Sequence, residues 1–146
     1  MLFDELANLI ADMGARSFKQ LEVATFLEDL MNAIPSPIFY KDVKGIYQGC
    51  NHAFAEFLGI PREKIIGSSV YDLSPYELAV KYEAMDSELF NNPRIQTYEY
   101  QATNHHGEKR QIIFNKAPYL NLNQQVAGLV GIMVDITQKK ELEMAL

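Results

Sequence analysis

The sequence predicts an α+β domain, a five-stranded antiparallel sheet with its helices packed on one face. Two short strand patterns come first, then helical segments, and then three longer strand patterns, so strands and helices are segregated along the chain. Turns rich in Asp, Asn and Gly join neighbouring strand patterns, which favours antiparallel pairing. The 146 residues, 48% hydrophobic and 22% charged, suit one such domain with additional terminal helices.

Composition and charge argue against several classes of protein. The net charge of −6 and a pI of about 5.0 disfavour a nucleic-acid-binding surface, which needs clustered Lys and Arg. No apolar run approaches the roughly 18 residues of a transmembrane helix, and the acidic start lacks the basic region of a signal peptide. The single cysteine, Cys50, fits a reducing compartment. We therefore expect a cytoplasmic location, no nucleic-acid partner and no membrane insertion in this stretch.

Two helices are predicted at the N-terminus. An apolar stripe at 4-3-4 spacing resembles the seam of a short coiled coil. Its members are Leu2, Leu6, Leu9 and Met13. Gly14 and the residues after it break the pattern. Ser17 and Gln20 have the spacing of a capping box, so a second helix is predicted from Ser17 to about Asn32, before Pro35.

Two short strands are predicted next, over residues 37–42 and 45–50. The turn between them has Asp42 at its first position and Gly45 at its last. Those residue types are typical of a tight turn, so the two strands should form a hairpin.

Short helices should follow this hairpin. Asn51 suits the N-cap of a helix that ends at Gly59. Pro61 begins a further helical turn that ends before Gly67. Residues 68–74 are predicted to form a connector.

The longest helix of the domain is predicted to begin at Ser74. Ser74 would be the N-cap, Pro75 the first helical residue and Glu77 the third, and Asn91–Pro93 would end the helix. Its apolar stripe at helical spacing consists of Leu78, Tyr82, Met85 and Leu89.

Three longer strands complete the predicted sheet. The first covers residues 95–103, the second 110–119, and the third begins at Val126. The third is apolar almost throughout, which favours a strand covered on both faces. It runs into Asp135–Thr137, and a charged helical pattern follows over 138–146. Because the chain stops inside this pattern, we expect a longer parent protein.

A series of short motifs resembles the PAS family, sensory modules of bacterial two-component kinases and cyclic-dinucleotide enzymes. The matching residues are Asp42, Gly45, Asn51, Ala53, Phe54, Phe57–Gly59, Ile66, Gly67, His106–Glu108, Gly128, Gly131, Ile132 and Asp135–Thr137. The resemblance implies a sheet order of 2-1-5-4-3 and a cavity between sheet and helices. It also implies three parts: a helical extension over 1–34 that dimerises, a PAS domain over 35–137, and a signalling helix beginning at 138.

The cavity-facing residues follow from the resemblance and from strand parity, because Glu99 and Gln101 should face outward. The predicted ligand-binding residues are Tyr82, Tyr98, Tyr100, Ile112, Phe114, Lys116, Leu129 and Met133, with Ala102 and Gly131 at the same parity. Two interpretations of the tyrosines stay open: they line a site for a small polar ligand, or they are core residues with hydroxyls at the rim. Lys116 would neutralise a ligand carboxylate or extend its ammonium to solvent.

Neither haem nor flavin nor a metal is expected. Flavin-binding relatives place their reactive cysteine on a helix, whereas Cys50 ends a strand and is expected to be a buried hydrophobe. Haem-binding relatives often use a histidine on the long helix, and residues 75–92 contain none. His105 and His106 lie in a predicted turn without further ligands nearby. No cofactor is firmly predicted, and a small organic ligand is the one bound group that stays open.

The sequence offers no catalytic constellation, such as a nucleophile elbow or a phosphate-binding loop, so we expect no enzymatic activity in this stretch. Asp135, Ile136 and Thr137 are predicted to relay the signal, with Asp135 fixing the junction between strand and helix through local hydrogen bonds. The favoured hypothesis is a homodimeric sensor that binds a small molecule and acts on a C-terminal histidine kinase or diguanylate cyclase domain. The alternative is a PAS fold without ligand that serves dimerisation or docking.

Overall fold

The computed structural model describes residues 2–146, and within them every side chain except those of residues 15 and 16. The chain divides into two units, Met1–Ala33 and Ile34–Leu146. Each unit is described by itself below.

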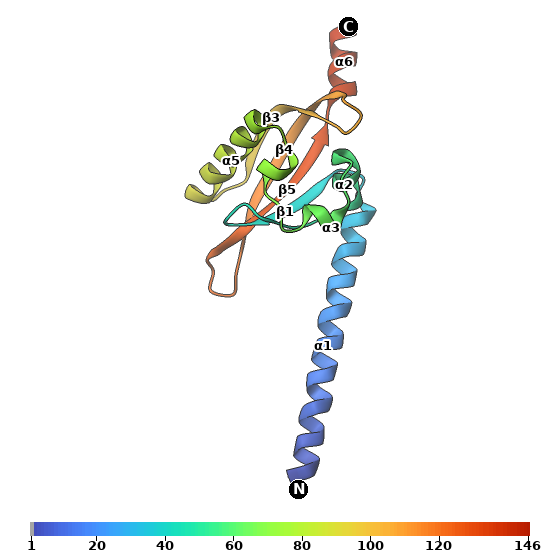
Figure 1. Ribbon diagram of the computed structural model, residues 1–146, viewed down its shortest axis with the longest axis vertical. Coiled ribbons are helices and arrows are strands. Elements are labelled where there is room, and N and C mark those ends of the chain that lie inside the picture. The colour runs from blue at the N-terminus through green and yellow to red at the C-terminus, as the bar shows by residue number, and fades with distance from the viewer. Residues whose placement is uncertain (1) are drawn as a thin grey trace. The chain divides into compact units, whose positions relative to one another are not determined.

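The first unit is a single helix, α1 (Leu2–Ala33), which Figure 1 draws without interruption. The predicted break at Gly14 and the predicted helix start at Ser17 are therefore wrong. A glycine in an exposed helix costs only about 1 kcal/mol relative to alanine, which the good helix formers on both sides outweigh. Large apolar side chains along α1 are exposed, among them Leu6, Leu9 and Leu21.

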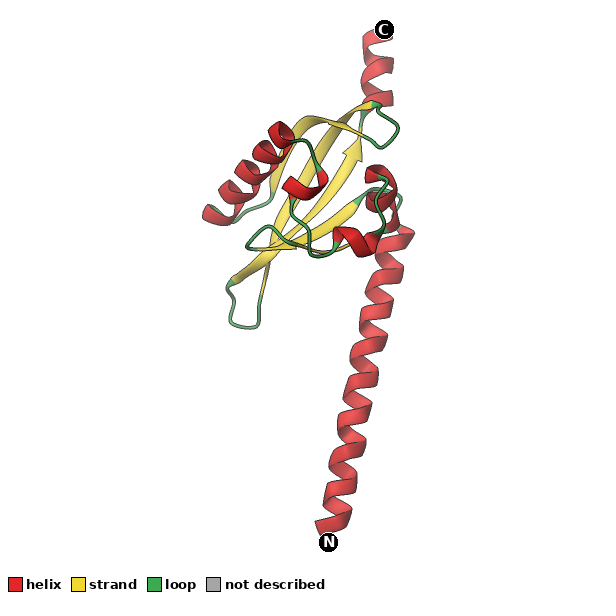
Figure 2. Ribbon diagram, viewed as in Figure 1, coloured by secondary structure: helices red, strands yellow, loops and turns green. Residues whose placement is uncertain are grey.

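The second unit is built on a five-stranded sheet (Figure 2). Its strands are β1 (Ile38–Asp42), β2 (Tyr47–Cys50), β3 (Gln96–Thr103), β4 (Lys109–Leu120) and β5 (Val126–Asp135). The order is β2-β1-β5-β4-β3, and every neighbouring pair is antiparallel. The predicted fold class and strand order are confirmed. The last strand in the chain, β5, lies at the centre of the sheet.

The β1–β2 turn forms as its residue types predict. The Gly45 N–H donates to the Asp42 carbonyl at 3.0 Å, and Gly45 has a φ of 81°, which favours glycine. The Asp42 carboxylate also accepts hydrogen bonds from the N–H groups of Lys44 and Ile46, at 2.9 and 3.0 Å. These bonds fix the hairpin that begins the domain.

Asn51 joins the start of the domain to helix α2 (His52–Leu58). Its side-chain oxygen accepts from the backbone N–H groups of Ile38 at 2.9 Å and Phe54 at 3.1 Å. Its amide nitrogen donates to the carbonyls of Ile34 at 3.2 Å and Ser36 at 2.9 Å. The predicted N-cap is confirmed, and the same side chain also holds the segment that leads into β1.

Two further helices follow, α3 (Arg62–Ile65) and α4 (Val70–Leu73). The predicted connector over 68–74 contains helix α4, whose start is a capping box of Ser69 and Asp72. The Asp72 carboxylate accepts a hydrogen bond of 2.9 Å from the Ser69 N–H.

The long helix α5 (Tyr76–Asn91) begins after Pro75, and no side chain caps its N-terminus. The predicted cap at Ser74 is therefore wrong. Ser74 instead ends α4, and its N–H donates to the Val70 carbonyl at 2.9 Å. The capping box thus lies one helix earlier, at Ser69 and Asp72.

The core lies between the sheet and helices α2 to α5, where side chains of one parity from each strand meet the helices. Its largest members are Phe39, Tyr47, Phe54, Ile65, Leu89, Ile112, Phe114, Leu129 and Met133. On the other parity of β5, Ile132 and Val134 are 37% and 38% exposed. The final helix, α6 (Thr137–Ala145), continues from β5 after Ile136. None of the helices in residues 2–146 combines the length and apolar character needed to cross a membrane.

Candidate functional site

A cavity of about 100 Å³ lies between the sheet and the helices. Every strand contributes to its wall, and so do helices α2, α4 and α5. Four of the predicted ligand-binding residues line it: Tyr82, Phe114, Lys116 and Met133. Aromatic and aliphatic side chains make up most of the remaining wall, including Phe39, Tyr47, Phe54, Phe57, Leu58, Leu73 and Leu78.

The other four predicted residues are not in this wall. Ile112 and Leu129 are buried in the core, and the Tyr98 ring stacks on Phe114 with centroids 5.1 Å apart. Tyr100 is 37% exposed, although the Lys81 ammonium of α5 lies 5.3 Å from its ring centroid. The Tyr100 side chain thus lies on the helix side of the sheet, as its parity predicts. Its strand, β3, lies at the sheet edge, where the helices give less cover.

A buried ionic cluster forms part of the cavity. Lys41 of β1 and Lys116 of β4 each donate to a different oxygen of Asp86 of α5, and both distances are 2.7 Å. Both lysines are only 2% exposed and Asp86 is 5% exposed. Lys116 donates a second hydrogen bond, of 2.6 Å, to the Tyr98 hydroxyl. Lys41, Asp86 and Lys116 are called the ionic cluster below.

The fold places these three residues by simple periodicity. Lys41 follows Phe39 by two positions on β1, and Lys116 follows Phe114 by two positions on β4, so both share the inward parity. Asp86 lies four residues after Tyr82 on α5, which puts both on the inner side of that helix. Lys116 does not extend to solvent, so that predicted alternative is wrong.

Sequence reasoning missed two members of the cluster, Asp86 and Lys41. The signal for Asp86 was its place on the apolar stripe of α5, between Tyr82 and Leu89 at helical spacing. The signal for Lys41 was its parity with Phe39. An acidic residue on one buried stripe and lysines on two buried strand faces together indicate an internal ion pair.

Burial controls the ionisation of the groups in this wall. The pKa of Lys116 is lowered to about 8, chiefly because the ammonium is removed from water; the Asp86 carboxylate opposes this shift and the nearby Lys41 adds to it. Burial also raises the pKa values of Tyr47 and Tyr98, and the Asp86 charge adds to both shifts. These tyrosines therefore stay protonated at neutral pH and act as neutral hydroxyls.

A second set of hydrogen bonds holds the junction between β5 and α6. The Asp135 carboxylate accepts from the Thr137 N–H at 2.9 Å, from the Thr137 hydroxyl at 2.6 Å and from Arg110 Nε at 2.7 Å. The predicted local bonds of Asp135 are thus present. Thr137 Oγ1 in turn accepts from the Gln111 N–H at 2.8 Å, and the Gln111 carbonyl accepts from the Ile136 N–H at 2.8 Å.

The junction therefore connects α6 to β4 as well as to β5. Arg110 and Gln111, both on β4, were missed in the sequence because they are cross-strand partners that only the sheet register brings close. Lys140 of α6 also pairs with Glu99 of β3. Burial alone would raise the pKa of Asp135, but the hydrogen bonds from Arg110 and Thr137 hold it below its usual value.

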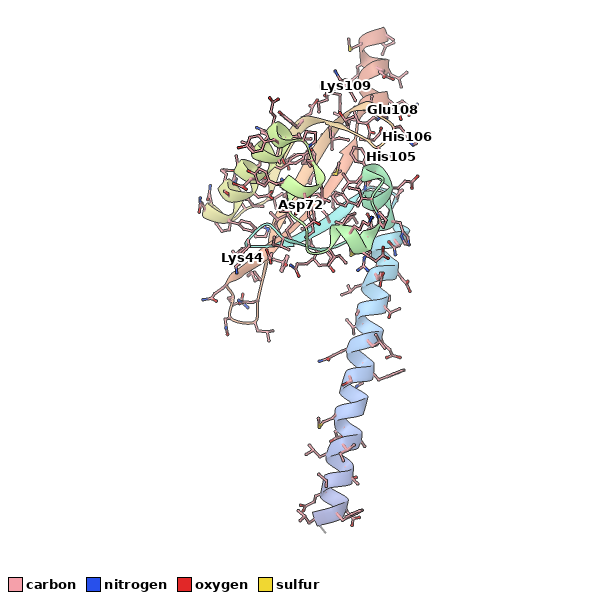
Figure 3. All side chains as sticks on the ribbon, viewed as in Figure 1. Lys44, Asp72, His105, His106, Glu108 and Lys109 are labelled. Atoms are coloured by element: carbon pink, nitrogen blue, oxygen red, sulfur yellow. The ribbon has the colours of Figure 1, made fainter. Side chains whose placement is uncertain are left out.

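His105 and His106 lie exposed in the turn between β3 and β4, where Figure 3 shows them beside Glu108. Their ring centroids are 3.7 Å apart, and the His105 N–H donates to the Phe57 carbonyl at 2.9 Å. Within residues 2–146 no group of three or more His, Cys, Asp or Glu side chains could hold a metal ion. Cys50 is buried in the core, as its position predicted.

The five-stranded antiparallel sheet, with helices on its inner face and a cavity between them, defines an α+β domain of one architecture. The family model described as "PAS fold" matches residues 31–141, and the chain belongs to this family. The family predicted from the motifs is confirmed.

Relatives and solved structures agree with this assignment. The aerobic respiration control sensor protein ArcB of Escherichia coli K12 is 28% identical over 123 residues, which cover 84% of this chain and 16% of ArcB. The PAS domain of Bordetella pertussis BvgS superposes with a TM-score of 0.70 at 24% identity, covering 87% of this chain and 93% of that one. The phage VqmA–DPO complex gives 0.70 at 20% identity, with coverage of 87% and 59%. The chain thus spans a small part of ArcB.

Proposed function

We propose that this PAS domain is the sensory module of a larger bacterial signalling protein, binds a small molecule in the cavity and relays its presence through α6. The observation that carries the proposal is the short path along β5. Met133 lines the cavity, and Asp135, two residues later, holds the junction with α6. A ligand that shifts β5 would therefore alter the hydrogen bonds that fix the exit helix.

The relatives support the wider part of this proposal. ArcB and BvgS are sensor proteins by name, and both are much longer than this chain. Phage VqmA, a protein that contains this fold, forms a complex with DPO. By the same reasoning, the parent protein carries an effector domain after α6, of the histidine kinase or diguanylate cyclase type. The PAS domain itself is not catalytic.

A second candidate function is a dimerisation or docking module without ligand. Two observations favour it: the cavity is small, and Tyr98 packs on Phe114 rather than lining empty space. The exposed apolar side chains of α1 fit a homodimer in either case, since such a stripe gains stability when a second helix covers it.

Methyl NMR on the purified chain separates the two candidates. Met133 lines the cavity, so its methyl resonance should shift when a small molecule binds, and the amides of Ile136 and Thr137 should shift with it. Native mass spectrometry of the same sample would reveal any ligand that copurifies. If no member of a metabolite library moves the Met133 signal, the dimerisation function is supported instead. If Met133 moves and Thr137 does not, the cavity binds a ligand without relay.

A further inference from the structure

The ionic cluster contains more positive than negative charge. Two ammonium groups share one carboxylate, and all three side chains are at least 93% removed from solvent. With all three ionised, the cluster carries a net charge of +1. A buried unbalanced charge is costly, because the low-dielectric interior replaces water around it. An anion entering the cavity would balance this charge.

The hydrogen-bond donors of the wall are also in excess. An ammonium has three N–H donors. Lys41 uses one on Asp86, and Lys116 uses one on Asp86 and one on Tyr98. Among the described residues, no further hydrogen bond of either ammonium is found. The hydroxyls of Tyr47 and Tyr82, which also line the cavity, have no hydrogen-bond partner in that part of the chain either. The wall therefore favours a ligand rich in acceptors.

We propose that the cavity is selective for a small organic carboxylate whose charged end contacts Lys41 and Lys116. This inference rests on the proposed function and adds the chemical class of its ligand. A single net positive charge matches a monoanion better than a phosphate dianion. The rest of the wall is largely apolar and includes Phe54, Phe57 and Leu58, so the other end of the ligand is apolar. The cavity volume of about 100 Å³ limits that end to a few heavy atoms.

Matched pairs of probes test the inference on the intact chain. Butyrate is compared with butyramide, and benzoate with benzamide, by titration at neutral pH while the Met133 methyl signal is followed. Each amide has the shape of its carboxylate without the charge. Because hydrogen bonds to a charged group are about twice as strong as neutral ones, at least one carboxylate should bind roughly 10-fold or more tightly than its amide.

The variant Lys116→Met should reduce this preference to about threefold or less, because it leaves Asp86 and Lys41 as a neutral pair. Lys109→Met is the matched control, since Lys109 is exposed at the start of β4 (Figure 3), and it should keep the preference. Should Lys116→Met fail to fold, the wild-type chain at high pH provides the same test. Deprotonation of Lys116 should then weaken carboxylate binding and leave amide binding unchanged. The charged or titratable groups facing Lys116 are Asp86, Lys41, Lys81, Tyr82 and Tyr98.

The outcomes are distinct. Equal binding of carboxylates and amides would overturn the inference and leave the proposed sensory function intact. A carboxylate preference that survives Lys116→Met, or survives at high pH, would also overturn it. Absence of binding by every probe up to about 10 mM, a concentration that detects even very weak ligands, would overturn the inference. The sensory function itself fails if the wider metabolite library also leaves Met133 unmoved, or if Met133 moves and Thr137 does not.

Discussion

Among individual residues, Asp86 sets the electrostatics of the cavity, because it is the acidic partner of both Lys41 and Lys116. Its two oxygens hold lysines from two strands that are not neighbours in the sheet, β1 and β4. Asp86 therefore ties helix α5 to the sheet at a point where apolar packing alone would not fix the register. Substitution of these three residues should lower the free energy of unfolding by different amounts, and the net charge that each variant leaves in the cluster predicts which loss is larger.

Asp86→Asn should destabilise the protein much more than Lys116→Met. The first change leaves two buried ammonium groups without a counter-charge, and loss of one partner of a buried pair typically costs about 3–5 kcal/mol. The second leaves the balanced pair of Asp86 and Lys41 and removes the hydrogen bond to Tyr98, so a cost of about 1 kcal/mol is expected. Urea denaturation followed by circular dichroism measures both. A smaller loss for Asp86→Asn than for Lys116→Met would contradict the charge count.

The lowered pKa of Lys116 predicts a dependence of stability on pH. Its folded-state pKa is about 8 and its ordinary value is 10.5, so between these values the unfolded chain binds more protons than the folded one. The Lys116 contribution to the unfolding free energy should therefore increase as the pH rises from 7 to 9.5, by about 2 kcal/mol. Above pH 10 the raised pKa values of Tyr47 and Tyr98 act in the opposite direction.

The measurement compares wild type with Lys116→Met in urea at several pH values across that range. The difference between their unfolding free energies isolates Lys116, because the other titrating groups are common to both chains. A difference that is constant with pH would show that Lys116 keeps an ordinary pKa in the folded state.

At the level of elements, the sequence predicts the strands well because strand parity and turn chemistry are local properties. The turn at Gly45 and the cap at Asn51 form as predicted because their hydrogen bonds lie within a few residues. The helix starts predicted at Ser17 and Ser74 are wrong because the residues before each serine are already helical: α1 runs through residue 17, and Ser74 ends α4. A capping pattern in the sequence does not contain that information about the preceding residues.

The site could be predicted only in part for a related reason. Phe114, Lys116 and Met133 follow from parity on their own strands and do line the cavity. Asp86 and Arg110 act through partners 30 and 25 residues away, and pairing at that separation requires the sheet register. The exposure of Tyr100 depends on how far the helices extend across the sheet edge, which no local pattern contains.

The junction between β5 and α6 gives a prediction at this scale. Asp135→Ala removes the acceptor of Thr137 and Arg110, so amides in the first turn of α6 should exchange with solvent several-fold faster. Glu143→Ala, on the exposed face of α6, is the control and should leave that turn unchanged. Hydrogen exchange followed by NMR measures both. Unchanged exchange in Asp135→Ala would show that the junction is held by other contacts.

At the scale of the whole molecule, the exposed apolar residues of α1 predict self-association. The paired change Leu6→Asp and Leu9→Asp places charge on the stripe, and it should raise the dimer dissociation constant by about 100-fold or more. Sedimentation equilibrium on the intact chain measures this constant. The control is Lys19→Gln, also exposed on α1. A wild-type chain that sediments as 16.6 kDa at every concentration would contradict the prediction.

The strand β5 is also hydrogen-bonded to the segment at the N-terminal end of the domain. The Met133 N–H donates to the Pro37 carbonyl at 2.9 Å, and the segment before Pro37 is held by Asn51. The cavity-lining Met133 is thus bonded to the segment by which the chain enters the domain. In the proposed relay, coupling between two sites is reciprocal. If ligand binding shifts the conformation of the entering segment, then a change that shifts this segment alters the ligand affinity by the same factor. The ligand concentration to which the domain responds would then depend on the segment that precedes residue 34 as well as on the cavity.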